Sequence, residues 1–265
     1  MRLDFVDFNL QGATVDGLCA NDLFTVLGGT SVAPSICGVN TGNHMYVDVG
    51  QTTNSVSLTV TTSGSSFPRS WKIKVTQLPC NTNYLAGSGC LQFHTGVTGQ
   101  VMTYNFNSAL GQELANQDYG ICIRMEAGYC GIQYATCTVA NETFTQAFSV
   151  SGTTVNTNPS SQTGSANCPF DWVVIPCLTN AQGAAGATQV TPFATQPCVD
   201  RICGTFFSSG QGQGAPPAYL GPYYSYRKPF VIYYHTNGQE TAQNDLGNRG
   251  FCLRYTQQPC TGTVG

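Results

Sequence analysis

Short stretches in which apolar and polar residues alternate recur along the whole chain. The clearest are residues 1–8, 56–61, 71–75, 101–106 and 230–234. Alternation with a period of two, rich in β-branched and aromatic residues, is typical of β-strands with one buried face. Gly, Asn and Pro separate these stretches and indicate turns. The pattern therefore predicts an all-β protein built from sandwiches of antiparallel sheets.

Three segments interrupt the strand pattern. Residues 151–167 are dominated by Ser, Thr, Asn and Gly, and residues 180–189 and 208–217 are rich in Gly, Ala and Gln. Such compositions are typical of loops. Cysteines flank these segments on both sides, which favours surface insertions within a domain over linkers between domains.

An internal repeat emerges when the cysteines are used as anchors. Three short motifs, C-x-x-D, I-C-G and T-Q-x-P-C, recur in the same order. They begin at Cys19, Ile36 and Thr76 in the first copy and at Cys168, Ile202 and Thr256 in the second. The second copy is longer between its first two motifs, and the extra residues include Cys177 and Cys198.

Composition narrows the classes of function. Charged residues make up 9% of the 265 residues, and the formal net charge is −3. A typical globular domain has about 25% charged residues. Ten Lys and Arg residues in all do not suffice for the clustered basic face of a nucleic-acid-binding protein. No apolar run is long enough to predict a membrane span.

Thirteen cysteines are scattered along the chain without CxxC pairs. The nearest in sequence, Cys198 with Cys203 and Cys130 with Cys137, are spaced too widely for a zinc knuckle. Disulfides persist outside the cytosol, so the pattern predicts a secreted, extracellular protein. The sequon that begins at Asn141 predicts an N-linked glycan at that residue.

The sequence contains no recognisable catalytic motif. The histidines His44, His94 and His235 form no H-x-x-x-H pair, and neither a G-x-S-x-G elbow nor a Walker loop occurs. A catalytic triad can be dispersed along a chain. However, the 13 acidic residues include no aromatic-flanked pair that suits a glycosidase. We therefore expect a protein that is not an enzyme, with histidines that hydrogen-bond within strands and loops.

The motif order of both copies resembles the second half of a CUB domain, which has C-x-x-D, an apolar strand, C-G and a final strand led by an aromatic residue. Before the second copy, the segments 89–90, 98–106 and 114–124 resemble the opening half of the same family. The sequences of residues 91–93, 115–119 and 128–130 are similar to those of extracellular CUB-containing proteins of arthropods.

The resemblance implies jelly-roll β-sandwiches with an extracellular role in recognition. Residues 1–80 would form a partial CUB-like domain, its closing half only, and residues 81–265 a full CUB-like domain with long loop insertions. A sandwich without its opening half leaves apolar faces and strand edges uncovered. We therefore expect the natural protein to extend upstream of Met1.

The resemblance also implies disulfide pairings. Cys19–Cys37 and Cys168–Cys203 follow the family's second disulfide, and Cys90–Cys122 follows its first. Beyond the family pattern, we expect Cys177–Cys198 to close the insertion, with local bridges Cys130–Cys137 and Cys252–Cys260. An odd cysteine count then leaves Cys80 to pair with a cysteine outside this chain. The alternative is a Cys80–Cys90 bridge, which would orphan Cys122.

Many CUB domains bind Ca²⁺ through three acids, of which the Asp of C-x-x-D is one. Asp22 and Asp171 match that residue, but the other two positions lack acids in both copies. Because Ca²⁺ takes six to eight oxygen ligands, we expect no cofactor. In this interpretation both carboxylates bond the backbone of a turn. Calcium at Asp22 or Asp171 is the alternative.

Tyrosines and prolines cluster in residues 216–226. The candidate interface residues are Tyr219, Tyr223, Tyr224 and Tyr226. Tyrosine gives a large contact area at a low entropy cost and is enriched at interfaces. The alternative is a loop folded over its own sheet. Trp71 and Trp172 lie in alternating strands and are expected to pack in the core.

Three functions remain open at this point. The leading hypothesis is a secreted, non-catalytic binding or structural protein that acts through CUB-type protein–protein contacts or self-association. The second is a glycan-binding module, and the third is a non-catalytic arm of a larger secreted protease. Neither nucleic acid nor membrane insertion is expected.

Overall fold

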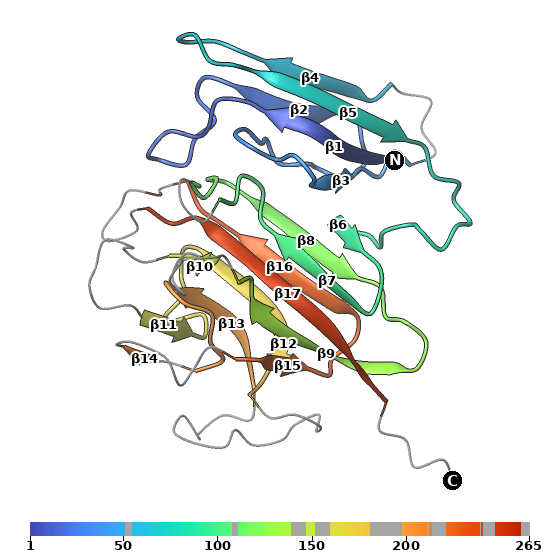
Figure 1. Ribbon diagram of the computed structural model, residues 1–265, viewed down its shortest axis with the longest axis vertical. Helices are drawn as coiled ribbons and strands as arrows, with labels where there is room; N and C mark the ends of the chain where they lie inside the picture. Colours follow the sequence, from blue (N-terminus) through green and yellow to red (C-terminus); the bar gives the residue numbers. More distant parts are fainter. Residues whose placement is uncertain are drawn as a thin grey trace.

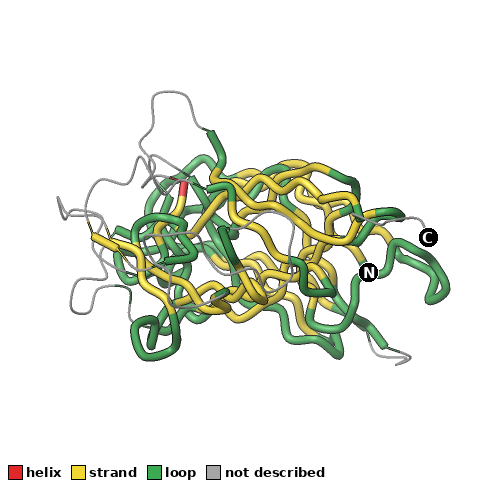
Figure 2. The backbone as a smooth tube through the Cα atoms, turned by 90° about the horizontal axis from the view of Figure 1, so that it is seen from below, coloured by secondary structure: helices red, strands yellow, loops and turns green. Residues whose placement is uncertain are grey.

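The computed structural model describes the chain as an all-β protein, as the alternation predicts (Figures 1 and 2). The described residues are 1–50, 55–107, 111–138, 147–151, 160–180, 198–210, 212–213, 221–238, 240 and 247–260. Within these ranges, no helix has the length and apolar character needed to cross a bilayer. The strands are β1 (Arg2–Asn9), β2 (Leu23–Leu27), β3 (His44–Tyr46), β4 (Ser57–Thr61), β5 (Ser70–Thr76), β6 (Cys90–His94), β7 (Thr98–Met102), β8 (Asp118–Ile123), β9 (Tyr129–Thr136), β10 (Phe148–Ser149), β11 (Ser160–Thr163), β12 (Trp172–Leu178), β13 (Val199–Gly204), β14 (Gly212–Gln213), β15 (Tyr223–Ser225), β16 (Phe230–His235) and β17 (Gly250–Pro259).

Residues 1–80, here called the first unit, form a small sandwich. One sheet has the order β3-β1-β5, and β2 pairs with β4 in the other. On β1, Leu3, Phe5 and Phe8 are buried. A register shift between Phe5 and Asp7 lets Phe8 reach the same face as Phe5. Phe5 and Phe8 both pack against Phe24 of β2, with ring centroids 5.7 and 5.6 Å away.

The described strands from β6 to β17, here called the second unit, form two larger sheets. One sheet has the order β14-β11-β13-β12-β16-β8-β6. The other has the order β10-β17-β9-β15, and β7 also pairs with β17. The consecutive strands β8 and β9 belong to opposite sheets, because β8 pairs with β16 and β9 with β17. This one stretch of chain therefore extends both sheets.

The sequence repeat is also a structural repeat. The pairs β1–β5 and β2–β4 of the first unit correspond to β10–β17 and β12–β16 of the second. At the I-C-G motifs, the Leu10 N–H donates to Gly38 O at 3.0 Å, and the Val150 N–H donates to Gly204 O at 2.9 Å. Both glycines have a positive φ, 76° and 113°, which explains why the motif carries glycine at this place.

Six disulfides brace the described residues, and four of them confirm the predicted pairings. These are Cys19–Cys37, Cys90–Cys122, Cys168–Cys203 and Cys177–Cys198. Cys80 is exposed and makes no disulfide, so the alternative Cys80–Cys90 bridge is not formed.

The two local bridges predicted from sequence proximity were wrong. Cys130 is bonded to Cys260 and Cys137 to Cys252. Cys130 and Cys137 lie near opposite ends of β9, and Cys252 and Cys260 near opposite ends of β17. Because a strand advances about 3.3 Å per residue, each predicted pair lies beyond the roughly 7 Å that a disulfide spans between Cα atoms. The antiparallel pairing of β9 with β17 brings the observed partners together instead.

The two units share one continuous core. Their buried apolar residues form a single cluster, and Phe5 of the first unit contacts Tyr104 of the second with ring centroids 6.4 Å apart. Hydrogen bonds also cross the junction. The Asn105 N–H donates to Asn40 Oδ1 at 2.8 Å. In Figure 1 the first unit lies at one end of the molecule, with β4 and β5 on the side away from the second unit.

The tyrosine segment belongs to the core as far as it is described, so the interface prediction was wrong for Tyr223 and Tyr224. Both lie in β15, which pairs with β9, and both are buried. Since adjacent strand residues point to opposite faces, β15 is covered on both faces. Tyr226 is partly buried, and Tyr219 lies outside the described residues.

We predict that Tyr223→Ser destabilises the protein strongly. The Tyr223 ring packs against Phe207 at 5.2 Å, so its loss should lower the free energy of unfolding by about 3 kcal/mol. The matched control is Tyr233→Ser on β16, because Tyr233 is 46% exposed and its loss should cost under about 1 kcal/mol. Denaturant titration of both variants measures the difference. Equal losses would contradict the buried position of Tyr223.

Candidate interaction surface

The first candidate calcium residue, Asp22, is neutralised by an arginine. Its carboxylate is buried and accepts bonds from Arg69 Nε at 2.7 Å, from the Gln11 N–H at 2.7 Å and from the Ser63 N–H at 3.3 Å. Burial opposes the charged form, but the bonds from Arg69 and the two backbone donors together hold the pKa of Asp22 below its usual value. The guanidinium therefore supplies the positive charge beside this carboxylate.

The second candidate, Asp171, also accepts a backbone hydrogen bond within its own unit. Its Oδ1 accepts from the Asn237 N–H at 2.7 Å, which corresponds to the bond between Ser63 and Asp22. In both units, C-x-x-D thus ties an early turn to a late loop. No cluster of three or more His, Cys, Asp or Glu suited to a metal occurs among the residues described. Calcium binding at Asp22 or Asp171 stays a prediction, and Asn141, the predicted glycan site, lies outside the described residues.

Two histidines meet where β3 of the first unit approaches β6 of the second. The rings of His44 and His94 are 4.8 Å apart, and the Phe93 N–H donates to His44 Nε2 at 3.0 Å. Burial, together with the charge of Arg2, lowers the pKa of His44 to about 4. Burial, the neighbouring His44 and Arg2 lower the pKa of His94 to about 3. Both rings are therefore neutral near pH 7 and serve as hydrogen-bonding parts of the junction.

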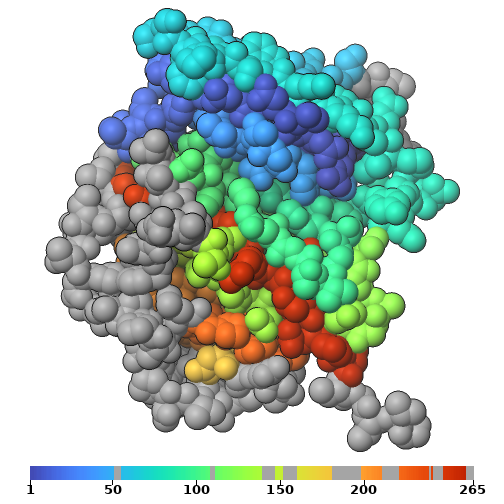
Figure 3. Space-filling model, in the orientation of Figure 1, coloured from blue at the N-terminus to red at the C-terminus, as the bar shows by residue number. Residues whose placement is uncertain are grey.

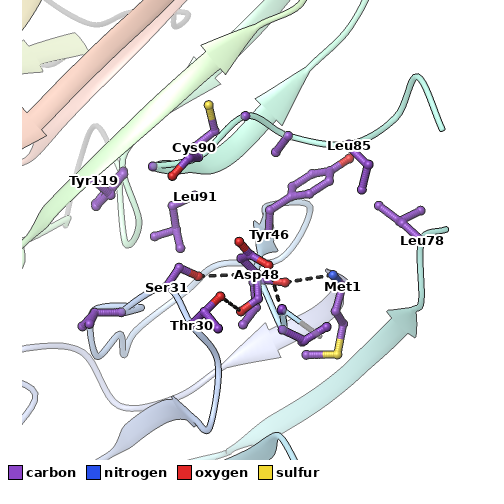
Figure 4. Close-up of a pocket in the computed structure, with 18 of the residues that line it drawn as sticks. Met1, Thr30, Ser31, Tyr46, Asp48, Leu78, Leu85, Cys90, Leu91 and Tyr119 are labelled. Carbon is purple, nitrogen blue, oxygen red and sulfur yellow. Dashed lines mark hydrogen bonds between the residues drawn. The ribbon is translucent and has the colours of Figure 1, made fainter. Parts of the chain in front are cut away.

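A cavity of about 570 Å³ opens beside this junction (Figure 4). Tyr46, Leu78 and Leu91 are among the residues that line it, and the acidic side chains in its described lining are Asp48 and Asp118. The Asp48 backbone is held by the loop before it, because Asp48 O accepts from the Thr30 N–H at 2.7 Å. The unbonded Cys80 also belongs to the lining.

The outermost strands of the first unit, β4 and β5, have open edges. β5 pairs with β1 alone, and β4 pairs with β2 alone, among the strands that the structure describes. Their counterparts in the second unit are paired on both edges: β16 lies between β12 and β8, and β17 pairs with β10 and β7 on one edge and with β9 on the other. An open edge exposes unpaired backbone donors and acceptors and can accept another strand.

Apolar side chains line the open side of the first unit. The group comprises Leu58 and Val60 of β4 and Trp71, Ile73 and Val75 of β5. They lie on the inner face, since Trp71 pairs with Phe8, Ile73 with Phe5 and Val75 with Leu3, all of which are buried. We call these five residues the open strip. In Figures 1 and 3 the first unit forms one end of the molecule, and no described strand is seen beyond β4 and β5 there.

The repeat shows how unusual this exposure is. The T-Q-x-P-C motifs align Trp71 with Phe251 and Val75 with Tyr255. Trp71 is 49% and Val75 48% exposed, whereas Phe251 is 0% and Tyr255 2% exposed. The open strip was missed at the sequence level, where Trp71 was expected in the core. The alignment of the two copies was the signal that could have found it.

Trp172, the other tryptophan expected in the core, is only partly buried. Its ring stacks on His235, with centroids 4.8 Å apart, and lies 4.3 Å from the Arg201 guanidinium. The strand alternation was correct, but Trp172 lies on the opposite face from the buried Val173. Its ring is engaged by neighbours of its own sheet.

Comparison with known proteins identifies the class of the larger unit. The family model described as the animal CUB domain matches residues 87–258. This is more than half of the chain, and the chain belongs to the animal CUB domain family. The match begins after the first unit, which is connected to the family only through the internal repeat.

Solved structures add little to this assignment. The CUB1-EGF-CUB2 domain of human MASP-1/3 is 15% identical, with 97% of this chain and 88% of that chain covered and a TM-score of 0.29. The CUB1-EGF-CUB2 domains of rat MASP-1 are 14% identical, with 96% and 86% covered and a TM-score of 0.27. At such TM-scores the likeness carries no argument about this chain. No curated protein sequence matches it.

We predict that acidification weakens the junction through His44 and His94. Their folded pKa values of about 4 and 3 lie below the usual 6.5, so between pH 6.5 and 4 the unfolded chain takes up protons that the folded chain does not. Stability should therefore fall across this window, by about 2 kcal/mol for His44 at pH 4.5. His44→Gln keeps an acceptor for the Phe93 N–H and should remove the part of the acid-induced loss of stability that is due to His44. Unfolding titrations at pH 7 and 4.5 measure it, and an identical pH dependence in the variant would refute it.

Proposed function

We propose that the protein is a secreted, non-catalytic extracellular protein that binds other polypeptides and takes part in durable assemblies. Membership of the CUB family supports this, because such domains mediate extracellular protein interactions. The six disulfides support an oxidising, extracellular location. The likeness to arthropod CUB-containing proteins stays a prediction.

One observation carries the proposal. On the inner face of β4 and β5, Trp71 and Val75 are half-exposed and the other three residues are only partly buried, although their counterparts in β16 and β17 are among the most buried described residues. Apolar surface is costly to leave in water, and an exposed patch beside open strand edges marks a site of association. The open strip is therefore the surface through which we expect this protein to bind a partner.

The two alternative functions have less support. The glycan-binding hypothesis depended on the tyrosine segment, but Tyr223 and Tyr224 are buried. Trp172, a partly exposed ring, is stacked on His235 and Arg201. The third hypothesis, a non-catalytic arm of a larger secreted protease, is compatible with a binding role for the open strip, and a protease domain in the full gene product would decide it.

We predict that Trp71→Ser has only a small effect on the stability of the fold. Trp71 is half-exposed, so its loss should lower the free energy of unfolding by only about 1 kcal/mol. The matched control, Phe251→Ser at the equivalent buried position, should cost about 3–5 kcal/mol. Denaturant unfolding measures both values. A loss for Trp71→Ser as large as that for Phe251→Ser would show that Trp71 is part of the core.

Hydroxyl-radical footprinting tests the binding role itself. In the isolated chain of residues 1–265, Trp71 should be oxidised readily. In native extracellular material, the same side chain should be at least about tenfold less reactive, because a partner covers it. Exposed Tyr84, outside the open strip, is the reference within the same sample. Equal oxidation of Trp71 in both preparations would contradict the proposed function.

A further inference from the structure

The second unit indicates what covers the open strip. We propose that the first unit binds a pair of consecutive β-strands like β8 and β9, carried by polypeptide outside residues 1–265, and that Cys80 forms a disulfide with a cysteine at the Cys130 position of that pair. This inference rests on the proposed binding role of the open strip and names its partner.

Strand edges provide the first line of support. In the second unit, β8 pairs with β16 along Phe230–His235, and β9 pairs with β17 from Leu253 to Pro259. The equivalents of β16 and β17 are β4 and β5, and these are the strands with an open edge. One strand pair of the β8–β9 type would extend both sheets of the first unit at once. No single strand added to one sheet would do so.

The apolar surface provides the second line of support. Ile232 and Tyr234 of β16, and Phe251, Leu253 and Tyr255 of β17, are all at most 2% exposed. Each has a less buried counterpart in the open strip, namely Leu58, Val60, Trp71, Ile73 and Val75. The uncovered residues thus fall on both sheets and on one side. This is the distribution expected if a β8–β9-like pair is missing from that side.

The cysteines give the third and most specific line of support. Cys260 follows β17 in the motif T-Q-x-P-C and is bonded to Cys130, the second residue of β9. Cys80 ends the same motif after β5 and is exposed and unbonded. The other cross-strand disulfide, Cys137–Cys252, has no counterpart, because Lys72 stands at the Cys252 position. The partner therefore needs one cysteine, at the start of its second strand, and none at the end.

A second copy of this chain does not fit as the occupant. Each chain carries one β8–β9 pair, which its own β16 and β17 already use. Exchange between copies would cover one open side and create another. The twelve remaining cysteines are all bonded, so a second copy offers Cys80 only its own Cys80. In the second unit, β8 and β9 come before β10, so we place the partner pair before β1 in the same polypeptide.

Formation of the bond follows ordinary thiol–disulfide exchange. The Cys80 thiol loses its proton, and its Sγ attacks the disulfide of an oxidoreductase in the secretory compartment. The partner thiolate then attacks Cys80 Sγ in this mixed disulfide and releases the oxidoreductase as a dithiol. Two protein thiols are oxidised to one disulfide, and the two electrons and two protons pass to the oxidoreductase.

Disulfide mapping of the native protein tests the assignment. The protein is alkylated without reduction and cleaved with chymotrypsin, which can cut at Tyr84 between Cys80 and Cys90. We expect the Cys80 peptide to be unalkylated and linked to a peptide of the same gene product that is absent from residues 1–265. The Cys130–Cys260 pair is the internal control. Alkylated Cys80, a Cys80–Cys80 link or a link to a separate protein would overturn the inference.

Hydrogen exchange gives a second readout that does not depend on the thiol. Amides of β4 and β5 should exchange at least about tenfold more slowly in the native protein than in isolated residues 1–265, whereas those of β16 and β17 should not change. Equal exchange of β4 and β5 in both would also overturn the inference. If Trp71 is protected in native material but Cys80 is alkylated, the proposed binding function stands and the strand-pair partner does not.

Discussion

The closure of both sheets by one stretch of chain is the constraint on which the second unit depends. A sandwich has two inner faces to cover and two outer strands whose backbone groups need partners. β8 and β9 meet both needs together, because they pair with β16 and β17 while those strands bury Tyr234 and Leu253. The first unit has the same inner strands without this closure, and its core is continuous with the second unit instead.

The disulfides fix this arrangement at the places where strands from distant parts of the sequence meet. Cys130–Cys260 and Cys137–Cys252 join the two ends of β9 to β17. In the usual treatment, a crosslink over a long loop removes much entropy from the unfolded chain. The bonded cysteines are separated by 130 and 115 residues. The chain has only 9% charged residues and many polar loops. Its disulfides therefore contribute stability that ion pairs on its surface are too few to provide.

Strand type and repeat were predictable from the sequence because they depend on local patterns. Alternation gave the strands around Val60, Ile73 and Val101, and the cysteine anchors gave Cys19–Cys37 and Cys168–Cys203. Pairing between strands was not predictable in this way, since it depends on which edges meet in space. That is why the bridges of β9 and β17 were assigned along each strand, and why buried tyrosines of β15 were interpreted as an interface.

The exposure of Trp71 could not be predicted from its own strand, for a related physical reason. The alternation in residues 71–75 specifies an inward face, and the structure confirms that Trp71 and Val75 share the face of the buried Phe8 and Leu3. Burial, however, is a property of what lies opposite a face, and an opposing strand is a distant part of the chain. Trp71 and Phe251 therefore have the same local pattern and opposite exposure. Comparison of the two units within one chain, where local sequence is matched and only the cover differs, isolates the contribution of β8 and β9. It shows that the open strip has the strand pattern of a buried face and lacks the strands that bury that face in the second unit.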